Sequence, residues 1–254
     1  RSLGSETLSC LTEDKHPYPR PCLKERLDRA IEKIEPEFIV ACYGMNDGIY
    51  HPLNEERMQA FQEGVFHLAT TSKAAKAPLL IITPPPFDSL AASAKLADEG
   101  APEFGYAHPY RGYDLVLGAF GDWQVEEAGR QWQVVDLHRD FKAQLMERRK
   151  TQADFSYAAD GVHPTPEGHL LIARIIARQS GMQVDAVLGQ DAETIFNDPL
   201  FKLVDQRRRA RSEAWLPYVG YTRGKVVASN SLKDLEATIQ RLDKEIKALQ
   251  SVTQ

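Results

Sequence analysis

The chain has 254 residues, enough for one α/β domain of about 200 residues and an appendage. Its composition, 43% hydrophobic and 26% charged, is that of a globular protein. Its net charge of −5 gives no general reason to bind nucleic acid or an anionic membrane. No apolar run approaches the roughly 20 residues that span a bilayer, so no membrane partner is expected.

Helical and strand patterns alternate along the first three quarters of the chain. In chain order they predict a helix over 21–35, a strand over 37–43, a helix over 54–75, a strand over 78–83, a loop over 87–110, a helix over 111–129, a strand over 133–137, and helices over 139–150 and 165–179. Pro21 suits a first turn, Asn54 is a predicted N-cap, and Thr165 with Pro166 opens the last helix. The alternation predicts a three-layer α/β/α fold with a parallel, flavodoxin-like sheet.

The composition changes after Gly181, so we expect a domain over 1–181 and a helical C-terminal extension over 182–254. A helix is predicted over 192–216. In 232–250, apolar residues step by four and three, which is the spacing of a short coiled-coil seam. This helix is too short to be stable alone. It either packs back on its own domain or pairs with a second copy, as a homodimer.

The three cysteines do not form a disulfide framework. Cys42 lies in an apolar run and is interpreted as a small core residue. Whether Cys10 and Cys22 pair depends on the compartment, and the sequence leaves this open. The chain begins at Arg1 without a methionine, so we expect that an export signal could have preceded it. The compartment is otherwise unknown.

Asp160 and His163 lie three residues apart, just before the last helix of the first domain, and Pro164 stiffens their turn. A histidine that moves protons and a carboxylate that orients it are two parts of an acyl-transfer site. Gly44-Met45-Asn46-Asp47 follows a predicted buried strand, at the edge of the sheet where ligands bind. There an Asn amide can stabilise a developing oxyanion. Each motif alone is more typical of a simple turn or polar surface.

Together, in this order around a parallel sheet, the two motifs resemble the third and fifth blocks of the SGNH (GDSL-type) hydrolases. The resemblance covers roughly residues 1–180. It implies that Asn46 is an oxyanion-hole donor, His163 the base and Asp160 the orienting acid, with Gly44 and Asp47 lining the site. No cofactor and no metal are implied.

Leu3-Gly4-Ser5-Glu6-Thr7 resembles the second block of the same family. Ser5 then takes the position of a glycine whose backbone N–H belongs to the oxyanion hole. A serine adopts the backbone angle of such a glycine less easily, so this angle is in doubt. The first block, a strand followed by Gly-Asp-Ser, does not occur in the sequence. We therefore expect the nucleophile to lie upstream of Arg1, with Ser5 a weak candidate. Loss of a central strand would leave the chain inactive and unstable.

The resemblance implies a serine esterase that forms an acyl-enzyme. Carbohydrate acetyl esters are the first choice of substrate, and other small acyl esters, lysophospholipids and thioesters are left open. Aromatic residues that could form a sugar-stacking rim are Tyr43, Tyr50, Tyr106, Tyr110 and Trp123, although ordinary packing explains them as well. His51 and His108 are expected at the cleft. The alternative function is a non-catalytic carbohydrate-binding or assembly module with the same fold.

Overall fold

A computed structural model describes residues 3–92, 94–128, 131–182, 189–221 and 232–252. The chain divides into two compact units, one of Ser2–Val184 and one of Asp185–Gln254 together with Arg1. No helix in these ranges is long and apolar enough to cross a membrane.

The first unit is built on a parallel sheet of three strands in the order β1-β2-β3. The strands are β1 (Ile39–Cys42), β2 (Leu79–Ile82) and β3 (Gln133–Val135). Ile39 pairs with Leu79, and Leu80 pairs with Gln133. All four side chains of β2 are buried, as the apolar run predicts for the middle strand of a sheet covered on both faces.

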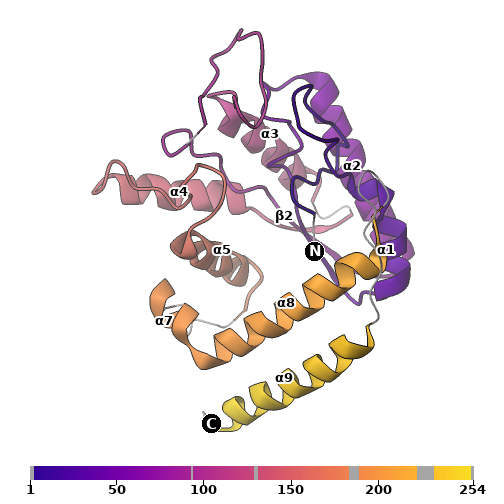
Figure 1. Ribbon diagram of the computed structural model, residues 1–254. Coiled ribbons are helices and arrows are strands. Elements are labelled where there is room, and N and C mark those ends of the chain that lie inside the picture. The colour runs from indigo at the N-terminus through magenta and orange to yellow at the C-terminus, as the bar shows by residue number, and fades with distance from the viewer. Residues whose placement is uncertain (1–2, 93, 129–130, 183–188, 222–231, 253–254) are drawn as a thin grey trace. The chain divides into compact units, whose positions relative to one another are not determined.

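Helices cover both faces of this sheet, so the fold is the predicted three-layer α/β/α arrangement (Figure 1). On one face the core contains side chains of α1 (Leu27–Ile34), α2 (Glu55–Ala74) and α3 (Tyr113–Glu126). On the other face it contains side chains of α4 (Leu137–Arg149) and α5 (Pro166–Gln179). Within β2, Leu79 and Ile81 face the first group, while Leu80 and Ile82 face the second.

Two helix starts follow the capping residues that the sequence predicts. The Asn54 side chain accepts a hydrogen bond from the Arg57 N–H at 2.8 Å and begins α2. The Thr165 hydroxyl accepts from the Gly168 N–H at 3.2 Å and begins α5, with Pro166 in the first turn. Because α5 begins here, the Asp160–His163 turn directly precedes a fixed helix end.

The helix predicted over 21–35 is wrong in its first part. Residues 23–25 form a short 3₁₀ turn, η1 (Leu23–Glu25), and α1 begins only at Leu27. Cys22 is extended because its neighbours pair with Thr7: the Thr7 N–H donates to Pro21, and the Leu23 N–H donates to Thr7, both at 2.9 Å. A long-range backbone pairing therefore overrides the local helical pattern.

Cys42 is exposed, which corrects its interpretation as a core residue. In the described part of the chain β1 pairs only with β2, so its other edge is open. Phe38 and Val40 are also exposed, at 49% and 57%. Leu80, the register partner of Val40, is only 8% exposed. One face of β1 thus lacks the cover that β2 has.

The second unit is helical and contains α7 (Ala192–Asn197), α8 (Pro199–Val219) and α9 (Lys233–Val252). The single helix predicted over 192–216 is divided at Asp198, whose carboxylate caps the Phe201 N–H at 2.9 Å, with Pro199 in the first turn of α8. α8 packs along α9, and Arg207 forms an ion pair with Asp243 at 2.5 Å. The apolar seam of 232–250 therefore has a partner helix within its own unit.

Candidate active site

The turns after β1 and β2 touch each other at the carboxyl end of the sheet. Gly44 has a φ of +134°, and a Cβ added there would lie 2.8 Å from the Pro84 ring. Any other residue would be strained in this backbone conformation and would also collide with Pro84. Gly44 therefore allows the turn that carries Asn46 and Asp47 to sit close against the loop that follows β2.

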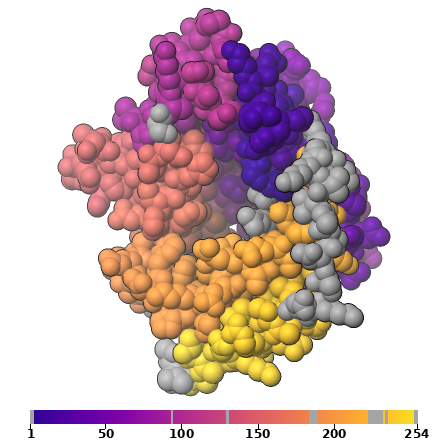
Figure 2. Space-filling view, viewed as in Figure 1, coloured from indigo at the N-terminus to yellow at the C-terminus, as the bar shows by residue number. Residues whose placement is uncertain are grey.

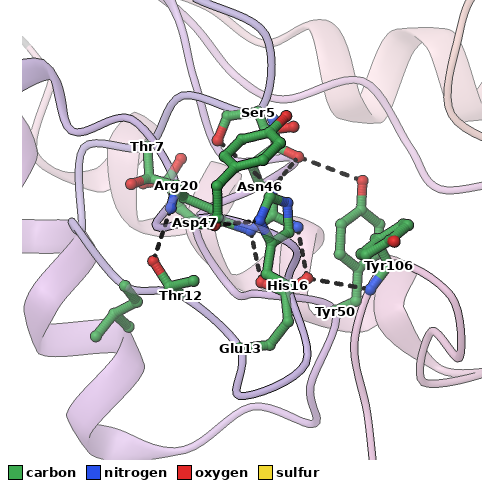
Figure 3. A network of polar contacts seen from close by, with 12 residues as sticks. Ser5, Thr7, Thr12, Glu13, His16, Arg20, Asn46, Asp47, Tyr50 and Tyr106 are labelled. Carbon is green, nitrogen blue, oxygen red and sulfur yellow. Dashed lines mark hydrogen bonds and ion pairs between the residues drawn. The ribbon is translucent and has the colours of Figure 1, made fainter. Parts of the chain in front are cut away.

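The orientation of the Asn46 amide is determined by its neighbours. Its Oδ1 accepts a hydrogen bond from Arg20 Nη1 at 3.0 Å and a longer one from the Tyr50 hydroxyl at 3.4 Å (Figure 3). A guanidinium can only donate, so the carbonyl end of the amide must face Arg20. The Nδ2 group makes no hydrogen bond to any residue within the described ranges, and it is left as a donor for a ligand.

Asp47 is fully buried and holds the N-terminal segment in place. Its Oδ1 accepts from the backbone N–H groups of Leu8 and Ser9 at 2.7 and 2.8 Å, and the Ser9 hydroxyl donates to the Asp47 carbonyl at 3.1 Å. Its Oδ2 is buried without a partner among the residues described. Burial raises the pKa of Asp47 to about 6, against the lowering effect of these hydrogen bonds. Asp47 therefore links the turn after β1 to the N-terminal segment.

Ser5 lies in a turn next to Asn46 and has a φ of +62°, in the left-handed region. The backbone angle that a glycine adopts easily is therefore present here in a serine. Its carbonyl oxygen accepts from Arg20 Nη1 at 3.5 Å, the same nitrogen that contacts Asn46. The Ser5 N–H makes no hydrogen bond within the described residues. One nitrogen of Arg20 therefore contacts both residues that carry the potential donors, Asn46 through its amide oxygen and Ser5 through its carbonyl oxygen.

Asp160 and His163 form a hydrogen-bonded pair. His163 Nδ1 and Asp160 Oδ2 are 2.7 Å apart, and Asp160 Oδ1 accepts from the backbone N–H groups of Val162 and His163 at 3.0 and 2.7 Å. Burial raises the pKa of Asp160, but the hydrogen bonds outweigh it and lower the pKa to about 2. A carboxylate that stays ionised keeps the proton of a neutral imidazole on Nδ1 and leaves Nε2 as a base. The His163 side chain is 83% exposed.

Asp88 fixes the position of the Asp160–His163 turn. The Asp88 N–H donates to the Gly161 carbonyl at 3.0 Å, and its Oδ2 accepts from Arg149 at 2.7 Å. The Ser156 hydroxyl donates to the same oxygen at 2.5 Å. Gly161 has a φ of +82°, and a Cβ there would come within 2.6 Å of the Asp88 carbonyl. The late turn is therefore docked on the loop that follows β2.

Tyr50 connects the two motifs. It donates to Asn46, and its ring contacts Phe87, the residue before Asp88, with centroids 6.5 Å apart. Burial raises the pKa of Tyr50 to about 12; the charge of Arg20 lowers it, and that of Asp160 raises it further. Ile49 and Tyr50 have φ values of +47° and +61°, which are unusual for such residues and often occur near functional sites.

The N-terminal segment is held by one disulfide and two buried ion pairs. Cys10 and Cys22 are bonded, with their Cα atoms 4.7 Å apart, which answers the pairing that the sequence leaves open. The pair of Glu13 and Arg20 is joined through Nε–Oε2 at 2.6 Å and Nη2–Oε1 at 2.7 Å. A second pair, formed by Glu6 and Arg26, has equivalent contacts at 2.6 and 2.8 Å. These contacts fix a loop with little regular secondary structure.

The loop of residues 13–20 and the loop of residues 102–108 lie side by side in Figure 2. Two hollows are lined by residues of both loops. His51 and Phe104 line one of about 400 Å³, and Glu13, Tyr106 and His108 line one of about 210 Å³. His51 and His108 therefore both border a hollow.

Of the aromatic residues considered for a rim, only Tyr106 is clearly exposed, at 48%. His16 contacts Tyr106 and Tyr18, with ring centroids 5.3 and 4.7 Å apart. Trp123 packs with Phe66 and Trp132, while the Tyr43 hydroxyl donates to Glu6 at 2.6 Å. The exposed aromatic side chains at this surface are therefore Tyr18 and Tyr106, both in contact with the half-buried ring of His16.

No group of three His, Cys, Asp or Glu side chains within the described ranges could hold a metal ion. Glu13, Arg20 and Asp88 are the site residues that sequence reasoning missed. A weak signal existed for Arg20, which stands between two prolines and between two cysteines, but nothing in the sequence pairs it with Asn46.

Comparisons with known proteins give only a distant likeness. No protein-family model and no curated protein sequence matches the chain. Among solved structures it is similar to a gut microbial diltiazem-metabolizing enzyme, with 19% identity and a TM-score of 0.46 over 62% of this chain and 36% of that one. It is also similar to a variant of Axe2, an acetylxylan esterase from Geobacillus stearothermophilus, with 19% identity and a TM-score of 0.45 over 63% and 67%. The chain thus spans about a third of the first protein's length, and likenesses of this degree say nothing about chemistry.

Proposed function

We propose that this chain supplies most of the active site of an ester hydrolase that acts through an acyl-enzyme. The observation behind this proposal is the Asp160–His163 pair, in which the carboxylate is held by two backbone N–H groups and lies 2.7 Å from Nδ1. This arrangement orients an imidazole with a basic Nε2 toward solvent. The oxyanion donors are the Asn46 amide and the Ser5 N–H, and Arg20 contacts both of these residues.

In this mechanism a serine hydroxyl attacks the ester carbonyl while His163 Nε2 takes its proton. The negative charge that develops on the carbonyl oxygen is stabilised by Asn46 Nδ2–H and by the Ser5 N–H. The tetrahedral intermediate then expels the alcohol, which receives the proton from His163. Water, activated by His163, finally hydrolyses the acyl-enzyme and releases the acid and the serine.

We propose that the nucleophilic serine is supplied by a strand outside the 254 residues, beside β1. The open edge of β1 and the exposure of Phe38, Val40 and Cys42 support this, because an added parallel strand and its connection would cover them. Acetyl esters of carbohydrates are the substrates we propose first. The aromatic group of Tyr18, His16 and Tyr106 beside Glu13 supports this choice.

The test compares the 254-residue chain with a chain extended at its N-terminus by the proposed strand and its serine. We expect only the longer chain to hydrolyse p-nitrophenyl acetate and an acetylated oligosaccharide, and only it to be labelled by a fluorophosphonate. In the longer chain, His163→Ala should reduce kcat by at least about 10³-fold, and Asn46→Ala by about 10²–10³-fold.

His169→Ala is the matched control, because His169 is an exposed histidine of α5, six residues further on, and its loss should leave kcat unchanged. Full activity of the 254-residue chain would show that no serine from outside it is needed. Equal activity of His163→Ala and the unmodified longer chain would contradict the proposed mechanism.

A further inference from the structure

The Arg20 guanidinium uses its nitrogens for two different purposes. Nε and Nη2 bind the two carboxylate oxygens of Glu13, at 2.6 and 2.7 Å. Nη1 contacts Asn46 Oδ1 at 3.0 Å and the Ser5 carbonyl at 3.5 Å (Figure 3). Glu13 thus forms an ion pair with the guanidinium and holds its plane, and the remaining nitrogen is aimed at two groups of the candidate oxyanion hole.

Stability alone is a poor explanation for this buried pair. Both side chains are almost fully buried, at 1% and 2% exposure. Moving two charges out of water is unfavourable, and well-packed apolar residues often replace such pairs with no loss of stability. An apolar pair could not replace the contacts of Nη1 with Asn46 and Ser5. The contact with Asn46 determines which end of the Asn46 amide faces the site.

The positive charge also acts on the Asn46 amide itself. A charged donor on Oδ1 draws electron density toward the oxygen, and linked hydrogen bonds polarise one another, so the Nδ2–H bonds become better donors. Tyr50 contributes to the same arrangement, since its hydroxyl donates to Oδ1 and its ring lies 5.6 Å from the Arg20 guanidinium carbon. The hydrogen bonds that Asn46 Oδ1 accepts therefore determine both the position of its Nδ2 group and the strength of this group as a donor.

We propose that Arg20 is a positioning residue that fixes the Asn46 amide as an oxyanion donor, beside the residue that carries the Ser5 N–H, with Glu13 holding Arg20 in place. This proposal rests on the proposed function, because it assigns a purpose to the donors of that site. Arg20 itself does not touch the substrate. The short loop between Cys10 and Cys22, which contains both Glu13 and Arg20, is then the element that orders the oxyanion hole.

The Glu6–Arg26 pair offers a matched control. It lies in the same N-terminal segment, is equally bidentate, and is as deeply buried. Its neighbour is the Tyr43 hydroxyl, whereas the Asn46 side chain bonds only to Arg20 and Tyr50 among the described residues. Arg20→Lys and Arg26→Lys therefore disturb similar ion pairs, but only the first disturbs Asn46.

The experiment uses the full 254-residue chain labelled with ¹⁵N, which needs no catalytic serine. The Asn46 Nδ2H₂ signals are assigned with Asn46→Asp, and sodium acetate serves as a probe for the oxyanion donors. We expect acetate to shift the Asn46 Nδ2H₂ and Ser5 N–H signals. Arg20→Lys should displace the Asn46 signals before acetate is added, and should weaken acetate binding about tenfold, as expected for one lost hydrogen bond to a charged group.

Arg26→Lys should lower the stability of the chain but leave the Asn46 signals and acetate binding as they are. If both variants move the Asn46 signals equally, or neither does, the positioning role is wrong. If Arg20→Lys does not fold, Glu13→Gln provides the same test. This variant keeps the guanidinium, so we expect a smaller displacement of the Asn46 signals. Failure of acetate to shift either signal in the unmodified chain would count against the proposed function, while the Asn46 signals still decide the role of Arg20.

Discussion

Asp47 is the residue whose ionisation the fold changes most clearly within the candidate site. Its carboxylate accepts two backbone hydrogen bonds on one oxygen, while the other oxygen is buried and has no partner in the described part of the chain. Burial dominates and raises its pKa from 3.8 to about 6. The folded chain therefore holds a proton on Asp47 at a pH where the unfolded chain has lost it.

This difference predicts how stability depends on pH. Because the folded pKa is raised, the contribution of Asp47 is fully present below about pH 4 and is lost as the pH rises through about 6. The loss amounts to about 3 kcal/mol at 1.36 kcal/mol per pKa unit. Asp47→Asn, which cannot ionise, should become more stable relative to the unmodified chain by about this amount between pH 4 and 7. Urea unfolding at several pH values measures it.

Asp191→Asn is the control for this prediction. Hydrogen bonds from Thr194 lower the pKa of Asp191, so it is ionised above pH 5 in both the folded and unfolded chain. Its stability difference from the unmodified chain should stay constant from pH 5 to 7. Parallel curves for Asp47→Asn and the unmodified chain would mean that the buried carboxyl does not titrate near pH 6.

Among single residues, the sequence predicted those candidate site residues that stand in short motifs at the ends of helices and strands. Asn46, Asp160 and His163 stand in short motifs beside predicted element ends, so their neighbourhood could be expected. The partnership of Arg20 with Asn46 spans 26 residues and depends on a loop without periodicity. No pattern of residue types encodes such a contact, and only the folded arrangement reveals it.

At the scale of elements, apolar runs and capping residues predicted the three strands and most helices. Prediction failed where distant segments impose a conformation, as at Cys22, which is bonded to Cys10 and paired with Thr7. The turn after β1 also depends on a distant segment, because Gly44 allows close contact with Pro84 in the loop after β2. In this case a glycine in a recognisable motif marked the position.

Replacing Gly44 tests its contact with Pro84 and its backbone angle of +134° together. Gly44→Ala adds a Cβ at 2.8 Å from Pro84, whereas Gly100→Ala adds one in open space, and both glycines have positive φ. We expect Gly44→Ala to lower the free energy of unfolding by about 2 kcal/mol more than Gly100→Ala, the usual size of overpacking effects. Equal losses in chemical denaturation would contradict an added cost at the contact with Pro84.

At the scale of the whole molecule, the open edge of β1 is the most exposed apolar part of the sheet. Unpaired strand edges can pair with other chains, and charged residues on them prevent this. Val40→Lys should therefore reduce concentration-dependent association in sedimentation velocity, with a stability change within about 0.5 kcal/mol because the side chain is 57% exposed.

Leu80 provides the comparison, since it is the register partner of Val40 and is buried. Leu80→Lys should unfold the first unit, because a charge would enter the core. If Val40→Lys is as damaging as Leu80→Lys, the outer face of β1 must be covered in the folded protein. If Val40→Lys folds but associates as before, the edge is not the site of association.

The disulfide between Cys10 and Cys22 also affects how the protein must be prepared. A covalent loop of this size is expected to contribute about 3 kcal/mol, and it contains the pair of Glu13 and Arg20. A host with a reducing cytosol, or a buffer with a thiol reductant, would yield chains whose loop is open. Activity measured on such material would describe a different molecule, so the oxidation state should be checked by mass spectrometry before any variant is compared.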